Sequence, residues 1–202
     1  MSDRARHEQP PSNWNVANAL TLVRLALVPV FVWLLLREGG EDVASRIAAC
    51  AVFSVAMVTD KLDGDIARRR GLVTDFGKIA DPIADKALTG GAFISLSLLG
   101  ELPWWVTVVV LTREIGVTLL RFVVLRYGVI PASRGGKLKT GLQALAIGLF
   151  VLPLPAAFDL LENTVMGAAV VVTLVTGVDY VVQAVRLRRG GRSGARTDGP
   201  ER

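Results

Sequence analysis

Four aspartates, Asp60, Asp63, Asp81 and Asp85, lie between segments that are apolar enough to cross a bilayer. An ionised carboxylate at such a place must be paired or must bind a cation, because leaving water without a partner costs it much of its solvation free energy. On a helix, Asp60 and Asp63 share one face because they are three residues apart. Gly77, Asp81 and Asp85 repeat every four residues and share a face of the next helix. Two facing helices would gather four carboxylates, which restricts the chain to folds with a polar site between helices.

Divalent cations would offset the repulsion within this carboxylate cluster. Two ions carry four positive charges, and a set of oxygen ligands favours magnesium or manganese over zinc. Residues 60–85 contain neither histidine nor cysteine. Gly64 and Gly77 have no side chain on the carboxylate faces, which leaves room for a ligand to approach the backbone. We therefore expect two Mg²⁺ or Mn²⁺ ions, held by Asp60, Asp63, Asp81 and Asp85.

The rest of the chain has the composition of a helical membrane protein. Of its 202 residues 51% are hydrophobic, and the mean hydropathy is +0.47. The first apolar run, residues 17–36, has one charge and is longer than a typical cleavable signal peptide, so we expect it to be retained. The prediction is an all-α integral membrane protein with six transmembrane helices, near residues 17–36, 43–70, 75–99, 104–125, 138–153 and 164–187. A flexible tail over 1–14 and a basic, disordered tail over 188–202 would flank a membrane domain over 15–187.

Basic residues follow a pattern along the loops. They gather in the N-terminal tail, around residues 68–78 and 126–139, and after residue 186, whereas the other three connections are poor in uncompensated positive charge. The positive-inside rule then places both termini and the aspartates on the cytoplasmic side of the cell membrane. The net charge of +5 and pI of about 9.9 could also suggest nucleic acid. Because the basic residues adjoin membrane segments, anionic lipid is the better interpretation and no nucleic-acid partner is expected.

Polar residues in the first segment lie on one helical stripe. Asn18, Thr21 and Arg24 are spaced by three residues. Hydrogen bonds between helices and ligand binding explain them equally well, and both interpretations stay open. Thr74 precedes the third segment, where an N-cap role alone would account for it.

The fourth and fifth segments carry further charges. Arg113, Glu114 and Arg121 lie inside an expected span, where charge is costly and indicates function by default, although Glu114 could simply pair with a neighbouring base. Lys137 and Lys139 lie at the expected start of the fifth segment. Basic residues at a helix N-terminus suit a phosphate group, and ordinary positive-inside charge is the alternative.

The aspartate stretch resembles the signature of the CDP-alcohol phosphotransferase family. That signature is DxxDGxxAR, eight residues, G, three residues, D, three residues, D, and this chain fills every fixed position: Asp60, Asp63, Gly64, Ala67, Arg68, Gly77, Asp81 and Asp85. The resemblance implies the family's fold, a homodimer, and metal binding by the four aspartates. It further implies that Asp85 removes the proton of the attacking hydroxyl. CDP-diacylglycerol would be bound by Asn18, Thr21, Gly64, Ala67, Arg68 and Thr74.

Two other runs resemble the phosphatidylglycerophosphate synthase branch of that family, REIxVTxLR at 113–121 and GKxKT at 136–140. The resemblance implies transfer of the phosphatidyl group from CDP-diacylglycerol to sn-glycerol 3-phosphate, with release of CMP. For the acceptor's phosphate we expect Arg113, Arg121, Lys137 and Lys139. The cardiolipin synthase and phosphatidylinositol phosphate synthase branches share the metal site and are the alternatives within the family. A cation-coupled transporter is the non-enzyme alternative, although the chain has no internal repeat.

Overall fold

The computed structural model describes the backbone of residues 16–70, 74–124 and 134–194, and side chains over these ranges except 16–17, 61–70, 75–76, 78–79, 122–124, 134 and 188–194. The described residues form helices and turns, with no strand among them. The α-helices are α1 (Val16–Leu36), α2 (Val43–Arg70), α3 (Asp75–Leu98), α4 (Trp104–Val124), α5 (Arg134–Val151) and α6 (Asp159–Gly194). The 3₁₀ turns are η1 (Arg37–Gly40) and η3 (Ala156–Phe158).

Every expected segment corresponds to one helix. The first four agree with the prediction within one residue at each end. α5 begins at Arg134 rather than near 138, and α6 extends beyond the expected 164–187 at both ends. Both helices begin with a polar first turn, and an apolar run does not mark such a turn. The predicted segments therefore begin too late.

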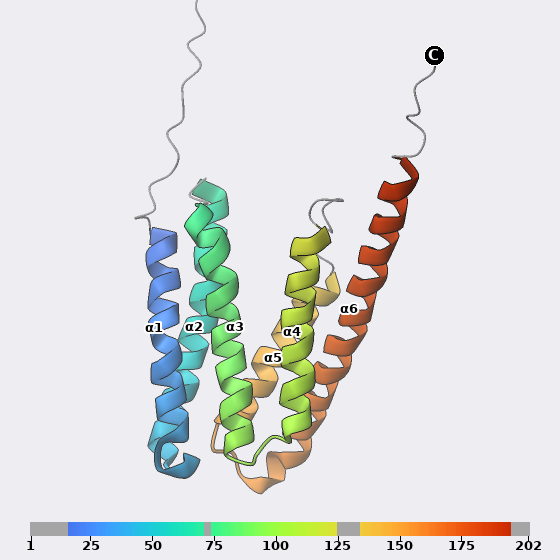
Figure 1. The fold of residues 1–202 in the computed structure, drawn as a ribbon. Coiled ribbons are helices and arrows are strands. Elements are labelled where there is room, and N and C mark those ends of the chain that lie inside the picture. The colour runs from blue at the N-terminus through green and yellow to red at the C-terminus, as the bar shows by residue number, and fades with distance from the viewer. Residues whose placement is uncertain (1–15, 71–73, 125–133, 195–202) are drawn as a thin grey trace, which may run out of the picture. The chain divides into compact units, whose positions relative to one another are not determined.

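The chain divides into two compact units, Met1–Ser95 and Leu96–Arg202. In the first, α1, α2 and α3 run in alternating directions (Figure 1). The rings of Phe31 and Phe53, with centroids 5.6 Å apart, join α1 to α2 in the core. A Cβ at Gly91 of α3 would lie 3.2 Å from Val32 Cγ2 of α1, so the glycine permits close packing of these two helices. α1 is therefore packed against both helices that carry the aspartates.

The second unit consists of the end of α3 with α4, α5 and α6, which also alternate in direction (Figure 1). Its buried side chains are mostly apolar, but polar pairs join the helices. The hydroxyl oxygens of Ser97 and Thr107 are 2.7 Å apart, and Gln143 Nε2 of α5 donates to Thr173 Oγ1 of α6 at 3.1 Å. Such bonds hold helices together where the surroundings are apolar on all sides.

Specific local signals end and begin the helices. Asp42 caps α2, because its carboxylate accepts hydrogen bonds from the backbone N–H groups of Ala44 and Ser45 and from the Ser45 hydroxyl. After α3, Gly100 adopts a φ of +77°, which favours glycine, and the next two N–H groups donate to Leu96 O. This turn lets α4 begin within a few residues.

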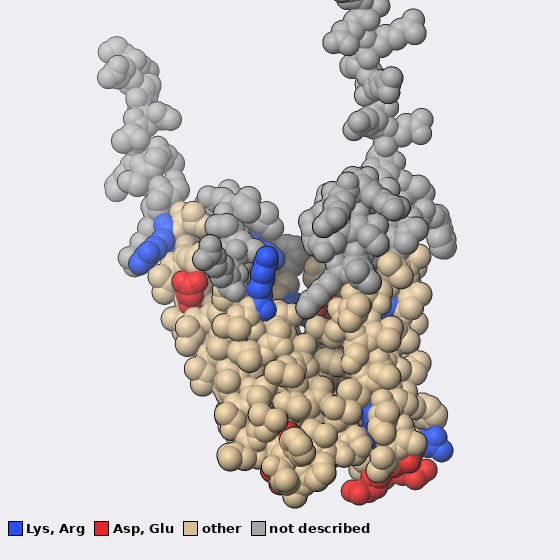
Figure 2. Space-filling view, turned by 180° about the vertical axis from the view of Figure 1, so that it is seen from behind, with Lys and Arg blue, Asp and Glu red and all other residues tan. Residues whose placement is uncertain are grey.

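The described helices have membrane character. Three of them are long and apolar enough to span a bilayer, over Asn18–Gly40, Val43–Asp60 and Ala156–Leu187. The face seen in Figure 2 is largely uncharged where it is described, and the charged side chains in view lie mostly towards the ends of helices. Valines and leucines are exposed along α6. Such a surface fits lipid rather than water, and the chain is a membrane protein.

Candidate active site

Polar residues of α1 contact the aspartate motif at three places. At the first, Asn18 Nδ2 donates to Thr74 Oγ1 at 2.8 Å, and both residues are buried. Thr74 Oγ1 also accepts the backbone N–H of Gly77 at 3.0 Å. That bond makes Thr74 the N-cap of α3, as the sequence predicted. The same hydroxyl thus starts α3 and ties it to α1.

Gly77 lies against this pair. A Cβ added there would be 2.9 Å from Asn18 Oδ1, 3.3 Å from Thr74 Oγ1 and 3.9 Å from Asp81 Oδ2. The first distance is shorter than a carbon–oxygen contact allows, so the Asn18 side chain or its helix would have to move to make room for a Cβ. Glycine is therefore required at this position because polar atoms of α1 and α3 converge on the backbone.

The second and third contacts involve the carboxylates themselves. Thr21 Oγ1 donates to Asp81 Oδ1 at 2.6 Å, and Arg24 Nη1 lies 2.6 Å from Asp60 Oδ1. Thr21 and Arg24 are buried, whereas the side chain of Asp60 is 36% exposed. Asn18 and Thr21 thus make the hydrogen bonds between helices that one interpretation of the α1 stripe predicted, and Arg24 makes an ion pair. Two of the three partners, Asp60 and Asp81, are carboxylates of the motif.

The carboxylates that the structure describes have the chemistry of a magnesium site. Asp60 is at the end of the apolar part of α2, and Asp81 and Asp85 are one turn apart on α3, each partly exposed. Oxygen donors with access to solvent suit a hard divalent cation. Among the described side chains no group of three acidic, histidine or cysteine residues is close enough to bind a metal ion by itself. The predicted ligand Asp63 and the predicted lipid-binding residues Gly64, Ala67 and Arg68 have side-chain positions outside the described part.

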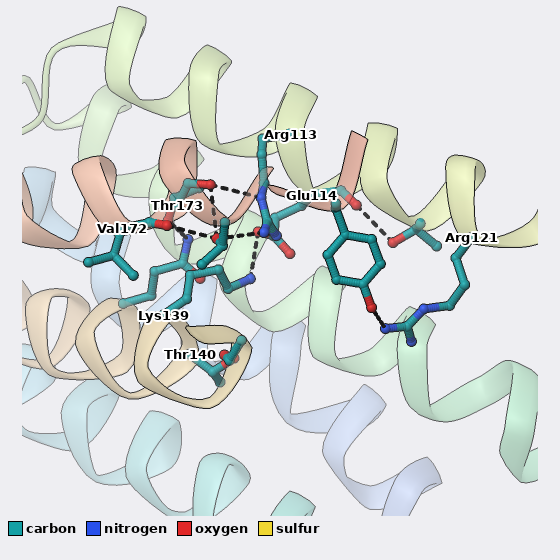
Figure 3. A network of polar contacts seen from close by, with 12 residues as sticks. Arg113, Glu114, Arg121, Lys139, Thr140, Val172 and Thr173 are labelled. Carbon is teal, nitrogen blue, oxygen red and sulfur yellow. Dashed lines mark hydrogen bonds and ion pairs between the residues drawn. The ribbon is translucent and has the colours of Figure 1, made fainter. Parts of the chain in front are cut away.

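A second polar cluster lies in the other unit and is centred on Arg113 of α4 (Figure 3). Its guanidinium makes three interactions: Nε donates to the backbone oxygen of Thr173 at 3.0 Å, Nη2 to Thr176 Oγ1 at 2.7 Å, and Nη1 to Glu114 Oε1 at 3.0 Å. A Cβ at Gly177 would lie 3.1 Å from Arg113 Cγ. The arginine therefore lies across α6 where that helix lacks a side chain.

Glu114 joins Arg113 to α5. Lys139 Nζ donates to Glu114 Oε1 at 2.6 Å, and both side chains are about nine-tenths buried. Arg113, Glu114 and Lys139 together form what we call the cation network, which carries one negative and two positive formal charges. The three formal charges of the cation network sum to +1. Lys137, two residues earlier, is exposed.

Arg121, the remaining predicted phosphate ligand, is not in this network. Its Nη2 donates to Tyr180 OH at 2.6 Å, and its guanidinium carbon lies 5.6 Å from the centroid of the Tyr180 ring. A hydrogen bond combined with a cation–π contact fixes Arg121 against α6. The structure thus brings together Arg113 and Lys139 of the predicted set and holds Arg121 separately.

Sequence reasoning missed several partners in these clusters. Nothing in the spacing indicated that Arg24 would meet Asp60, or that Arg121 would meet Tyr180. Thr173, Thr176 and Gly177, which are small or polar and lie within one turn of α6, were the available signal for a contact surface, since such residues are enriched where membrane helices pack closely. It does not indicate which side chain is received there.

Comparison with known proteins shows which family this sequence resembles and which of its members are similar over most of the chain. A family profile described as CDP-alcohol phosphatidyltransferase matches residues 14–175. The chain is 58% identical over 172 residues to a Mycobacterium tuberculosis (strain H37Rv) protein named "Probable phosphatidylglycerophosphate synthase", with 85% of this chain and 82% of the relative covered. It is 37% identical over 182 residues to the Bacillus subtilis (strain 168) "CDP-diacylglycerol–glycerol-3-phosphate 3-phosphatidyltransferase", covering 83% and 93%. It is also 33% identical over 181 residues to a Streptomyces coelicolor "Cardiolipin synthase (CMP-forming)", covering 86% and 84%.

Proposed function

The chain belongs to the CDP-alcohol phosphatidyltransferase family, and from this premise we propose that it is a phosphatidylglycerophosphate synthase. It transfers the phosphatidyl group of CDP-diacylglycerol to sn-glycerol 3-phosphate and releases CMP. The observation that carries the proposal is the similarity, over more than four-fifths of the chain, to two relatives named for this reaction. The cation network is consistent with it, because the acceptor brings a phosphate that needs positive partners.

In this proposal Asp60, Asp63, Asp81 and Asp85 hold two divalent cations, Mg²⁺ or Mn²⁺. The described aspartates fit such ions through their oxygen donors and partial exposure. When bound, the cations stabilise negative charge on the reacting phosphoryl group and on the departing CMP.

The chain's own residues bind and orient the substrates. The nucleotide-lipid is bound by two sets of residues: Gly64, Ala67 and Arg68, and Asn18, Thr21 and Thr74. The hydrogen bonds of Asn18 to Thr74 and of Thr21 to Asp81 support a shared role for the second set. Asp85 takes the proton from the 1-hydroxyl of glycerol 3-phosphate. The oxygen of that hydroxyl then bonds to the β-phosphorus, and the bond from this phosphorus to the oxygen that leaves with CMP breaks.

The acceptor's phosphate is bound by Lys137 and Lys139, with Arg113 and Arg121 contributing positive charge. Lys139 is buried beside Glu114, whereas Lys137 is exposed and able to reach a soluble substrate. If the double variant Lys137→Ala, Lys139→Ala kept the wild-type Michaelis constant for glycerol 3-phosphate, this assignment would be dropped.

The setting of the reaction is also proposed. Six helices span the cell membrane, both termini and the aspartates face the cytoplasm, and the enzyme is a homodimer. Residues 15–187 form the membrane domain between two tails. The three apolar helices and the basic loops support this topology. α6, with 36 residues, is about 54 Å long, more than a hydrocarbon core of about 30 Å, so its basic end extends past the membrane.

Cardiolipin synthesis is the second candidate, because the Streptomyces coelicolor relative with that name is 33% identical over most of its length. The two reactions share the donor and differ in the acceptor, which would be phosphatidylglycerol. A lipid acceptor needs access from the bilayer and fewer buried charges, so the cation network favours glycerol 3-phosphate.

The deciding experiment measures CMP release by the purified protein in detergent with CDP-diacylglycerol and Mg²⁺. Glycerol 3-phosphate, inositol 1-phosphate, inositol, serine and phosphatidylglycerol are compared as acceptors. Turnover with glycerol 3-phosphate alone is expected. Turnover with phosphatidylglycerol alone would select the second candidate, and no CMP release with any acceptor would contradict both.

A further inference from the structure

Arg24 has no part in the reaction just described, yet it is a charged side chain at a costly position. It is the only charged residue within the apolar run 17–36, and its side chain is 1% exposed. A guanidinium cannot lose its charge in a protein, so its burial within a membrane segment must be offset by interactions with the charged form. The charged groups that Arg24 contacts therefore indicate why it is there.

One partner of Arg24 is Asp60, the first aspartate of the motif. Arg24 Nη1 and Asp60 Oδ1 are 2.6 Å apart, which is the distance of a close ion pair. The arginine is buried while the aspartate is 36% exposed. The ion pair therefore links the buried side of α1 to a carboxylate that remains accessible. A carboxylate offers about four lone-pair positions on two oxygens, and it can accept this contact and bind a cation as well.

A second contact from the same helix reaches a second motif carboxylate. Thr21, one turn before Arg24, donates to Asp81 Oδ1 at 2.6 Å. Asp60 is on α2 and Asp81 is on α3, so a single helix holds one oxygen of each. The aromatic contact of Phe31 with Phe53 and the close approach at Gly91 fix α1 against both helices.

We infer that Arg24 is a positioning residue for the metal-binding carboxylates. It sets the orientation of Asp60 with respect to Asp81, so that a divalent cation meets a preformed pair rather than two carboxylates that repel each other. Thr21 has the same role for Asp81 with a weaker, uncharged contact. This inference rests on the metal site proposed above and extends it to residues outside the signature.

A different role for Arg24 would have the opposite consequence. If the guanidinium were only a counter-ion that competes with the cation for Asp60, removing it would strengthen cation binding. Removing a positioning residue weakens cation binding. The carboxylate must then be ordered when the cation binds, and this ordering costs free energy. The sign of the change in affinity separates the two roles.

The test is a Mn²⁺ titration of the purified full-length protein in detergent, with free Mn²⁺ followed by electron paramagnetic resonance. Wild type is compared with Arg24→Gln, Arg24→Lys and Thr21→Val. Arg37→Gln is the matched control, because Arg37 is a 48% exposed arginine at the other end of α1 that pairs with the exposed Glu38. CMP release by each variant is measured as a function of Mg²⁺ concentration in parallel.

Arg24→Gln is expected to raise the Mn²⁺ dissociation constant by about 10- to 100-fold, the range found when groups that orient metal ligands are removed. Arg24→Lys should recover part of this loss, Thr21→Val should lose less, and Arg37→Gln should stay within about twofold of wild type. Unchanged or tighter binding by Arg24→Gln would overturn the inference. If that variant does not fold, wild-type affinity in both Arg24→Lys and Thr21→Val would overturn it. Absence of Mn²⁺ binding by wild type would instead contradict the metal site itself.

Discussion

The two units of the chain each contain a polar cluster built from opposite charges. In the first, buried donors of α1, Thr21 and Arg24, point to carboxylates that are partly exposed. In the second, a buried carboxylate, Glu114, accepts hydrogen bonds from two bases. The accessible groups are acidic in one cluster, and the excess charge is positive in the other. In the proposed function the first cluster binds cations and the second binds the acceptor's phosphate.

The clusters also differ in how deeply their central charges are buried. Asp60, Asp81 and Asp85 retain exposure, whereas Glu114, Arg113 and Lys139 are nine-tenths buried or nearly so. Removing one partner of a buried ion pair costs stability, because the remaining charge stays in a poor solvent. Removing a partly exposed carboxylate such as Asp85 costs less stability and mainly affects what it binds. Substitutions can separate these two cases.

The largest effect is expected from Asp85→Asn. The amide is nearly isosteric but neither takes a proton nor carries charge for a cation, so CMP release should fall by more than about 10³-fold, corresponding to several kcal/mol. The thermal unfolding midpoint should change little, since Asp85 is only partly buried. Asp159→Asn, at the exposed start of α6, is the matched control and should keep its activity. An active Asp85→Asn protein would refute the proposed base.

Glu114→Gln should show the reverse pattern. Arg113 and Lys139 would then face each other without the carboxylate, and the free energy of unfolding should fall by about 3–5 kcal/mol. Thermal unfolding in detergent measures this loss, with Glu162→Gln, in the partly exposed first turn of α6, as control. A variant with wild-type stability but no turnover would show that Glu114 belongs to the chemistry, and the contrast between the clusters would fail.

A smaller effect is expected at the two glycines next to the clusters. Gly77→Ala places a Cβ 2.9 Å from Asn18 Oδ1, so the Asn18 side chain, which is hydrogen-bonded to Thr74, or its helix must shift, at a cost of about 1–3 kcal/mol. Gly177→Ala meets the flexible side chain of Arg113 at 3.1 Å and should cost less. Gly167→Ala, with no atom within 4 Å, should stabilise the chain by about 0.5–1 kcal/mol through helix propensity. Equal unfolding midpoints for all three would contradict the close packing at Gly77.

The smallest effect should come from Asp42→Ala, outside both clusters. Hydrogen bonds, first from the Ser45 side chain and then from backbone N–H groups, lower the Asp42 pKa below its ordinary value of 3.8. A carboxyl whose pKa is lower in the folded state stabilises that state above pH 3.8 and stops doing so as the pH falls through the folded pKa. The variant should therefore melt slightly below wild type at pH 5–8, and the difference should shrink below pH 3.8. A constant difference down to pH 2 would contradict the capping role.

Local patterns in the sequence were sufficient to predict most helix boundaries and the motif. Apolar runs of spanning length predicted the first four helices within one residue at each end, and Thr74 was identified as an N-cap. These features depend on local rules, because helix geometry fixes which residues share a face and which hydroxyl can reach the first turn. The family followed from the spacing of the aspartates for the same reason. The start of α5 and both ends of α6 were missed, because apolar runs do not mark polar first and last turns.

The side-chain partners, by contrast, follow from the way the helices pack in the folded chain. The contacts of Asn18 with Thr74, Thr21 with Asp81 and Arg113 with Thr173 join residues 56 to 60 positions apart. Lys139 meets Glu114 rather than standing alone at a helix start, and Arg24 meets Asp60. Such pairings depend on how each helix is rotated and how closely it packs, which follows from the sum of many apolar contacts and small residues rather than from any local pattern.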